Sequence, residues 1–218
     1  MADIKLTIIV ISKDDIIGFR RTMKSLSFPV PENIEIVLVV ADKNNAYWPY
    51  LDSVQYSHLL YNEDNGLYDA MNRGIECSSG AYVNFLNGGD CFHNEFNLES
   101  FVSKLNGDLC CFNVLGTKGI IGPGLQGVRP HQGIFYKKEI IKRNPFDSAF
   151  KIHGDMDHWY RLKRTLSLKI IVHDMIYAHF EGGGISEQMR LTSAYELFKI
   201  GVRHKSFKRI LSALNRLI

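Results

Sequence analysis

The sequence lacks any apolar stretch approaching the roughly 20 residues that a membrane-spanning helix needs. Its first residues also lack the basic segment of a secretory leader, because Asp3 precedes a short β-branched run from Leu6 to Ile11. Only four residues are cysteine, and no Cys-x-x-Cys pair occurs. These absences indicate reduced thiols and predict a cytoplasmic protein.

What is present is typical of a soluble globular chain. The 218 residues are 45% hydrophobic and 22% charged, which excludes a disordered or fibrous protein. The net charge of +3 is unevenly placed. Seven Lys/Arg and one acid lie from Arg190 onward, against 19 basic and 22 acidic residues before it. The basic tail predicts an anionic partner surface, whereas nucleic-acid binding is not expected, because the excess is confined to the tail and no aromatic platform accompanies it.

Apolar runs alternate with helical patterns along the chain. Strands are expected at 5–12, 34–40, 58–61, 81–86, 108–115, 134–136 and 168–172, and helices at 16–26, 47–51, 66–76, 98–105 and 155–166. This alternation predicts an α/β fold with a mainly parallel sheet flanked by helices. We expect one domain over residues 1–188 and a helical tail over 189–218.

Polar residues follow consecutive expected strands. Ser12, Asp42, the run Asn62 to Asn65 and the turn Asn87 to Asp90 each come at a strand's carboxyl end. Ligands of such sheets bind beyond the carboxyl ends of the strands. Asp and Asn are also common turn residues, so each position alone admits a purely structural interpretation. Their recurrence at consecutive strand ends favours a nucleotide or metal site.

Two of these segments resemble a known family. They are Asn62-Glu-Asp-Asn-Gly-Leu-Tyr-Asp-Ala-Met-Asn-Arg-Gly-Ile75 and Ser79-Gly-Ala-Tyr-Val-Asn-Phe-Leu-Asn-Gly-Gly-Asp90. Together they resemble the family-2 glycosyltransferases of GT-A fold, above all the bacterial exopolysaccharide and O-antigen branch of colanic-acid type. The first two expected strands and the run from Phe180 to Ser186 also resemble this family, so the similarity spans roughly residues 5 to 186.

The resemblance implies an inverting, hexosyltransferase-type enzyme that uses a nucleotide-diphosphate sugar and Mn²⁺ or Mg²⁺. It places the metal at Asp90 and the acceptor or phosphate contacts at His131 and Gln132. His179, just before the run Gly182-Gly-Gly184, is a candidate for a further metal ligand or for a phosphate contact. The donor-binding positions that it implies are Ser12, Asp42, Asp64, Asn65, Asn72 and Asn87. The Asn87-Gly-Gly-Asp90 turn departs from the common Asp-x-Asp pattern of the family.

An inverting transfer needs one general base to deprotonate the acceptor hydroxyl. The segment Ile152 to Arg161 resembles the Glu-Asp segment that opens a helix in this family, which makes Asp155 the expected base. Asp157 lies two residues further on and cannot share a helix face with Asp155, so we expect a structural role for it. The alternative for Asp155 is a first-turn acid that favours the helix dipole.

The tail and one glycine-rich loop complete the predictions. Apolar residues recur every three or four positions from Phe207 to Ile218 with Lys and Arg between them, a pattern typical of a basic amphipathic helix. Such a helix binds an anionic membrane surface or docks on the protein body. Gly122 to Gly127 formally matches a dinucleotide motif, but it follows no first strand and opens no helix, so we expect a cover over the donor site instead.

The predicted function is therefore inverting sugar transfer onto a glycan, expected to be lipid-linked, in bacterial surface-polysaccharide assembly at the inner face of the cell membrane. One alternative is a sugar-nucleotide nucleotidyltransferase. That class carries a glycine-rich basic loop after the first strand, which Ser12-Lys-Asp-Asp15 does not supply. Another alternative is a non-catalytic module that binds nucleotide sugars.

Overall fold

The computed structural model describes residues 4–26, 30–41, 47–52, 55–61, 65–93, 101–117, 119–122, 130–180 and 189–217. The strands are β1 (Leu6–Lys13), β2 (Ile34–Ala41), β3 (His58–Tyr61), β4 (Tyr82–Asn87), β5 (Cys91–Phe92), β6 (Leu109–Gly116), β7 (Gly119–Ile121), β8 (Ile134–Lys137) and β9 (Ile170–Phe180). The helices are α1 (Ile16–Ser25), α2 (Trp48–Leu51), α3 (Leu67–Cys77), η1 (His131–Gly133), α5 (Lys138–Arg143), α6 (Gly154–Thr165), α8 (Arg190–Arg203) and α9 (Phe207–Leu217).

One sheet of order β3-β2-β1-β4-β8-β6-β9-β5 runs through the molecule, with β7 paired to β6. The four strands from β3 to β4 are all parallel, as expected for βαβ units. Beyond β4 the sheet is mixed, because β8 runs antiparallel to both β4 and β6, while β9 runs parallel to β6. The prediction of an α/β fold with a mainly parallel sheet is confirmed, because among the described strands only β8, β5 and β7 run against the direction that the other six share.

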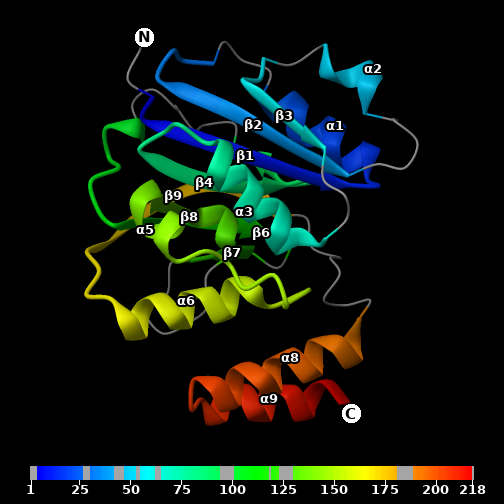
Figure 1. Ribbon diagram of the computed structural model, residues 1–218, viewed down its shortest axis with the longest axis vertical. Helices are drawn as coiled ribbons and strands as arrows, with labels where there is room; N and C mark the ends of the chain where they lie inside the picture. The colour runs from blue at the N-terminus through cyan, green and yellow to red at the C-terminus, as the bar shows by residue number, and fades with distance from the viewer. Residues whose placement is uncertain are drawn as a thin grey trace.

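Strand alternation sorts the core onto two faces of the sheet. In β1 and β2 the even-numbered residues pack with α1 and α2, and the odd-numbered residues pack with α3, α5 and α6. Both strands are almost completely buried, which explains why they are rich in β-branched residues. Figure 1 shows α1 behind the sheet and α3 and α5 in front of it.

The expected helices and strands are largely present, whereas β5, β7, η1 and α5 were not among the predicted elements. The last expected strand, 168–172, is the 11-residue strand β9. Of the expected helix at 98–105, only residues 101 and 102 are helical among those described. The helical tail predicted over 189–218 is confirmed, and it consists of two helices, α8 and α9, of which only the second was predicted from an apolar pattern of its own. Figure 1 shows α8 and α9 together at the end of the molecule opposite the N-terminus.

The boundary predicted at 188/189 lies at the edge of the 181–188 segment, outside the described residues, and stays a prediction. The loop predicted to cover the donor site, residues 122–127, falls mostly within 123–129, which also lie outside the described residues. Within the part of the chain that the structure describes, no helix has the length and apolar character to cross a bilayer.

Candidate active site

The carboxyl ends of β1 and β4 lie side by side, with Ile11 in register with Asn87. Ser12 is buried at this edge, and its Oγ lies 3.0 Å from the Tyr47 hydroxyl. A Cβ on Gly88 would lie only 2.6 Å from Ser12 Oγ, so this position in the turn after β4 requires glycine. The predicted donor residues Ser12 and Asn87 are thus brought to one edge of the sheet.

The turn from Asn87 to Asp90 is fixed by its own hydrogen bonds. Asp90 is 3% exposed, and its Oδ2 accepts hydrogen bonds from the Asn87 N–H at 2.8 Å and from Gln132 Nε2 at 2.9 Å. The Gly89 N–H donates to Thr22 Oγ1 at 2.9 Å, which ties the turn to α1. Gly89 adopts a φ of 101°, which favours glycine. The geometry therefore holds the Asp90 carboxylate in a fixed place before any ligand binds.

Burial raises the pKa of Asp90 from its ordinary 3.8 to about 6, although the His131 imidazole and the hydrogen bonds from Gln132 and Asn87 act to lower it. The carboxylate is therefore ionised at neutral pH and would gain from a nearby cation. A perturbed carboxyl at a strand end is a recognised marker of functional sites.

Asn84 was missed by the sequence analysis, although it organises this site from inside β4. It is fully buried, and its Nδ2 donates to the carbonyl oxygens of Gln132 at 2.8 Å and Ile134 at 3.0 Å. The Tyr177 hydroxyl donates to Asn84 Oδ1 at 2.9 Å. A buried amide must have hydrogen-bond partners, so an Asn inside an otherwise apolar strand was the sequence signal that could have identified this residue. Asn84 thereby fixes the segment that carries His131 and Gln132.

His131 joins the two halves of the site. Its Nε2 lies 3.0 Å from Asn87 Nδ2, and its Nδ1 lies 3.5 Å from Asp155 Oδ2. The imidazole is buried between a residue of β4 and a residue of α6. The predicted donor-side residues Asn87 and Asp90 and the predicted base Asp155 therefore belong to one cluster, together with His131 and Gln132.

Asp155 lies in the first turn of α6 with a side chain that is 22% exposed. Its Oδ1 accepts a hydrogen bond from the Met156 N–H at 2.8 Å and lies 3.3 Å from the Tyr68 hydroxyl. Burial acts to raise the pKa of Asp155, but His131 and the Met156 N–H outweigh it and hold that pKa below the ordinary value. Asp155 is thus kept as a carboxylate, the form that accepts a proton.

Asp157 has other partners. It is fully buried, with Arg161 Nε 2.9 Å from its Oδ2, and Arg203 Nη1 and His204 Nε2 3.0 and 2.9 Å from its Oδ1. Two of these three partners come from the tail, at the C-terminal end of α8. This pairing accords with the structural role expected for Asp157.

Glu196 of α8, which the sequence analysis did not single out, holds the backbone in front of Asp155. It is 4% exposed, and its two carboxylate oxygens accept hydrogen bonds from the N–H groups of Lys151, Ile152 and His153 at 2.7 to 3.0 Å. Charge-assisted bonds of this kind are stronger than neutral ones. The tail helix α8 therefore positions the segment that leads into α6 and Asp155.

We expect Glu196→Gln to destabilise the protein by about 1–3 kcal/mol, because a single amide oxygen cannot accept all three N–H groups and leaves a buried donor unpaired. The free energy of unfolding from urea denaturation checks this. Glu139→Gln is the matched control, since Glu139 pairs with Lys137 on an exposed surface, and it is expected to change stability by less than about 0.5 kcal/mol. Equal stability of the two variants would contradict the role of Glu196.

Of three further predicted site residues, Asn72 and Asn65 lie at α3 and just before it, and His179 pairs in the sheet with Cys91, the residue after Asp90. Asn72 bonds the backbone of Phe146, accepting from its N–H at 2.9 Å and donating to its carbonyl at 3.0 Å. Asn65 is exposed just before α3. His179 of β9 lies with its Nε2 2.6 Å from His93 Nδ1, next to β5. Asp42 and Asp64 lie outside the described residues.

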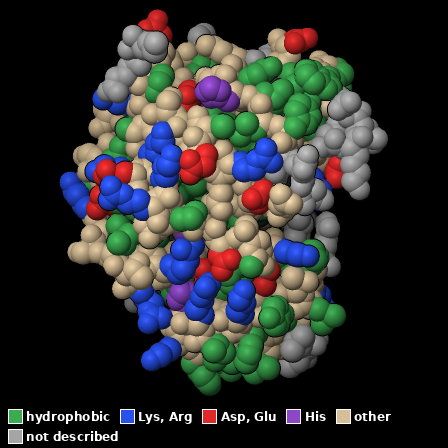
Figure 2. Space-filling view, viewed as in Figure 1, with side chains coloured by type: hydrophobic (Ala, Val, Ile, Leu, Met, Phe, Trp, Pro, Cys, Tyr) green, Lys and Arg blue, Asp and Glu red, His purple; other side chains and the backbone are tan. Residues whose placement is uncertain are grey.

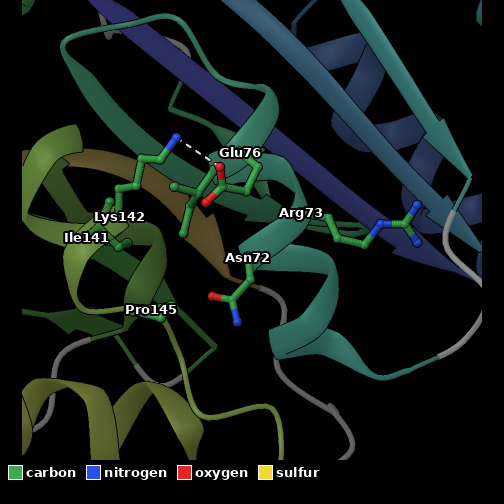
Figure 3. Close-up of a pocket in the computed structure, with 7 residues that line it drawn as sticks. Asn72, Arg73, Glu76, Ile141, Lys142 and Pro145 are labelled. Carbon is green, nitrogen blue, oxygen red and sulfur yellow. Dashed lines mark ion pairs between the residues drawn. The ribbon is translucent and has the colours of Figure 1, made fainter.

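A small pocket between α3 and α5 is lined in part by Asn72 (Figure 3). Its volume of about 140 Å³ is below the roughly 300 Å³ at which ligand sites begin. An ion pair between Lys142 and Glu76 closes one side of it at 2.9 Å. This pocket is therefore too small to be the donor site.

The described residues contain no group of three or more His, Cys, Asp and Glu side chains that could hold a metal ion by itself. They do contain the Asp90 carboxylate and, close by, the Asn87 Oδ1, which is buried without a hydrogen-bond partner. Mg²⁺ is commonly held by one or two carboxylates together with substrate phosphates. The donor set fits a hard divalent cation that is completed by a diphosphate.

Comparison with solved structures shows the same fold in proteins whose structures contain nucleotide sugars. The chain matches Staphylococcus aureus TarS in complex with UDP-GlcNAc, with a TM-score of 0.65 and 17% identity over 98% of this chain and 72% of that one. It also matches the mannosyltransferase PcManGT of Pyrobaculum calidifontis in complex with GDP-Man and Mn²⁺, with a TM-score of 0.67 and 11% identity over 96% and 68% of the two chains. The GT-A-like fold is thereby confirmed.

Sequence comparison gives the family. The uncharacterized glycosyltransferase Rv1514c of Mycobacterium tuberculosis is 24% identical over 93% of this chain and 85% of its own length. The profile described as Glycosyl transferase family 2 matches residues 7–163, which include β1, the Asn87–Asp90 turn, His131 and Asp155. The chain is therefore a member of glycosyl transferase family 2.

Proposed function

We propose that this glycosyltransferase transfers a hexose from a nucleotide-diphosphate sugar to a hydroxyl of a glycan acceptor with inversion at the anomeric carbon. The observation that carries the proposal is the His131 bridge, which places the ionised Asp155 in one cluster with Asn87 and Asp90. A donor-side carboxylate and a separate base are the two parts that such a transfer requires.

In the proposed reaction Asp155 accepts the proton of the acceptor hydroxyl as that oxygen attacks the anomeric carbon. The bond from carbon to the acceptor oxygen forms, and the bond from carbon to the diphosphate oxygen breaks. The nucleoside diphosphate leaves with the electron pair. The low pKa of Asp155 keeps the base ionised, and the Met156 N–H and His131 hold its orientation.

Asp90 and the Asn87 side-chain oxygen would hold Mn²⁺ or Mg²⁺ together with the donor diphosphate. When bound, the cation would neutralise the charge that develops on the leaving group. Gln132 and the Asn87 N–H orient the Asp90 carboxylate for this purpose. TarS and PcManGT, whose structures contain UDP-GlcNAc and GDP-Man with Mn²⁺, support a nucleotide-sugar donor.

The acceptor that we propose is a lipid-linked glycan of bacterial surface-polysaccharide assembly, handled at the cytoplasmic face of the membrane. This part of the proposal rests on the resemblance of the segments at 62–75 and 79–90 to the exopolysaccharide branch. Ser12, Asp42, Asp64, Asn65 and Asn72 remain proposed donor contacts, and His179 a proposed metal ligand.

Turnover with UDP-, GDP- and dTDP-sugars, each with and without Mn²⁺ or Mg²⁺, tests the proposed function. We expect cation-dependent release of one nucleoside diphosphate and, with lipid extracts as acceptor, a product whose anomeric configuration by NMR is opposite to that of the donor. Binding of a nucleotide sugar without turnover on any acceptor would instead identify a non-catalytic module, and retention of configuration would refute the role of Asp155.

A further inference from the structure

The two tail helices form a hairpin that is built into the protein body on one side. Leu197 and Ile200 of α8 and Ala213 of α9 are buried in the same core cluster as α3 and α6. Gly201 permits the close approach of the two helices, since a Cβ there would lie 2.6 Å from the Ile210 side chain. The inner face of the hairpin is therefore a packing surface, and its outer face is free to serve another purpose.

That outer face is apolar. On α8 the side chains of Leu191, Tyr195, Phe198 and Val202 are 50–76% exposed. They are spaced by four, three and four residues, so they form one stripe along the helix. Figure 2 shows hydrophobic side chains gathered at the end of the molecule where α8 and α9 lie.

The second helix repeats the pattern. Phe207, Leu211 and Leu214 of α9 are 45–72% exposed and are spaced by four and three residues. Together the two stripes place seven exposed apolar side chains on two packed helices, whereas a soluble domain normally exposes such side chains singly. An apolar surface of this kind indicates a binding partner.

The charges around this surface are of one sign. Residues 189–217 carry seven Lys/Arg and one acid, Glu196, which is buried on the inner face. Arg190, Lys205 and Lys208 are exposed, whereas Arg203 is paired with Asp157 and Asp147 of the protein body. A second copy of the chain would set this cationic rim against itself, because a two-fold contact pairs the same patch of both subunits. An anionic partner with an apolar interior satisfies both the charge and the exposed side chains.

We propose that the outer face of the α8–α9 hairpin is a docking surface for an anionic phospholipid bilayer. The apolar stripes enter the boundary between headgroups and acyl chains, and the lysines and arginines contact lipid phosphates. Docking does not depend on sugar transfer. It has a consequence for the proposed reaction, however, because Glu196 on the opposite face of α8 holds the backbone at 151–153 that leads to Asp155. The lipid surface and the base would be linked through one rigid helix.

Vesicle flotation tests the docking surface. We expect the full chain to float with vesicles of mixed phosphatidylcholine and phosphatidylglycerol and to stay behind with phosphatidylcholine alone. The double variant Leu191→Ser/Phe207→Ser is expected to bind the mixed vesicles at least about tenfold more weakly. Both side chains are more than 70% exposed, so the fold does not depend on them. Ile17→Ser on α1, with a side chain 70% exposed, is the matched control and is expected to float normally.

Charge-reversal variants distinguish electrostatic attraction to anionic lipid from non-specific hydrophobic adsorption to vesicles. Lys205→Glu/Lys208→Glu is expected to weaken flotation at least about tenfold and to remove its sensitivity to salt, whereas Lys24→Glu/Lys104→Glu at exposed positions elsewhere is expected to have little effect. Equal flotation of all variants, or of neutral and anionic vesicles, would overturn the proposal. The proposal would also be overturned if light scattering showed a dimer of the wild type, and if Leu191→Ser/Phe207→Ser dissociated that dimer without changing flotation. Release of nucleoside diphosphate in solution is measured in parallel, so that loss of docking and loss of transfer are distinguished.

Discussion

Replacing Asp155 by asparagine is expected to lower kcat by about 10²- to 10⁴-fold, the contribution typical of a positioned general base. Asparagine has the same shape, and its Oδ1 can still accept the hydrogen bond from the Met156 N–H that Asp155 accepts at 2.8 Å. What is lost is the negative charge opposite His131 Nδ1 and the capacity to take a proton. The fold and the donor site should therefore survive.

Kinetics and binding must be measured together for this variant. We expect kcat to fall while the Kd for the nucleotide sugar, followed by calorimetry with Mn²⁺, changes by less than about threefold, because an interaction made mainly in the transition state affects kcat and not ground-state binding. Glu139→Gln on exposed α5 serves as the control for removal of a carboxylate. A parallel loss of donor affinity in Asp155→Asn would assign Asp155 to donor binding and refute its role as base.

The sequence predicted those parts of the fold that local patterns determine. β1 and β2 are rich in β-branched residues, and they are strands buried on both faces. Helix α3 has a single apolar face and ends before Gly80, so its bounds were nearly correct. Helix α8 was predicted only as part of a helical tail, without bounds of its own, because its apolar residues lie all around it. Those at 197 and 200 face the core, and those at 191, 195, 198 and 202 face outward. No single stripe marks such a helix.

For the candidate site, too, the sequence predicted the features that depend on local residues and missed the contacts between distant segments. The turn at Asn87–Asp90 and the acid at Asp155 carry their own signals, since each ends a strand or opens a helix. Their contact does not, because it depends on the antiparallel pairing of β8 with β4 and on the η1 turn that carries His131. Asn84 and Glu196 were overlooked for a related reason, since the partners of these buried polar groups come from segments 43 to 93 residues away.

Replacing Asp90 by asparagine is expected to abolish the cation-dependent part of donor binding while making the free protein as stable as the wild type or more so. Burial raises the pKa of Asp90 to about 6, so the folded state binds this proton more tightly than the unfolded chain does. The free energy of unfolding therefore decreases as the pH rises from about 4 through 6, and above pH 6 the folded protein bears the full free-energy cost of the buried Asp90 charge. Asparagine carries no charge to desolvate, and its oxygen can still accept from Gln132 and the Asn87 N–H.

The pH dependence of donor binding tests whether the ionised Asp90 carboxylate holds the cation. In the wild type the affinity for nucleotide sugar with Mn²⁺ should rise as the pH passes through about 6, because the carboxylate must be ionised to hold a cation. In Asp90→Asn the affinity at pH 7.5 should be about 10- to 100-fold lower, with no rise near pH 6, whereas the melting temperature at that pH should not fall. Asp52→Asn, at an exposed carboxyl, is the control. An Asp90→Asn variant that keeps full Mn²⁺-dependent affinity would remove the metal from the Asn87–Asp90 turn, and the buried charge of Asp90 would then need a different explanation.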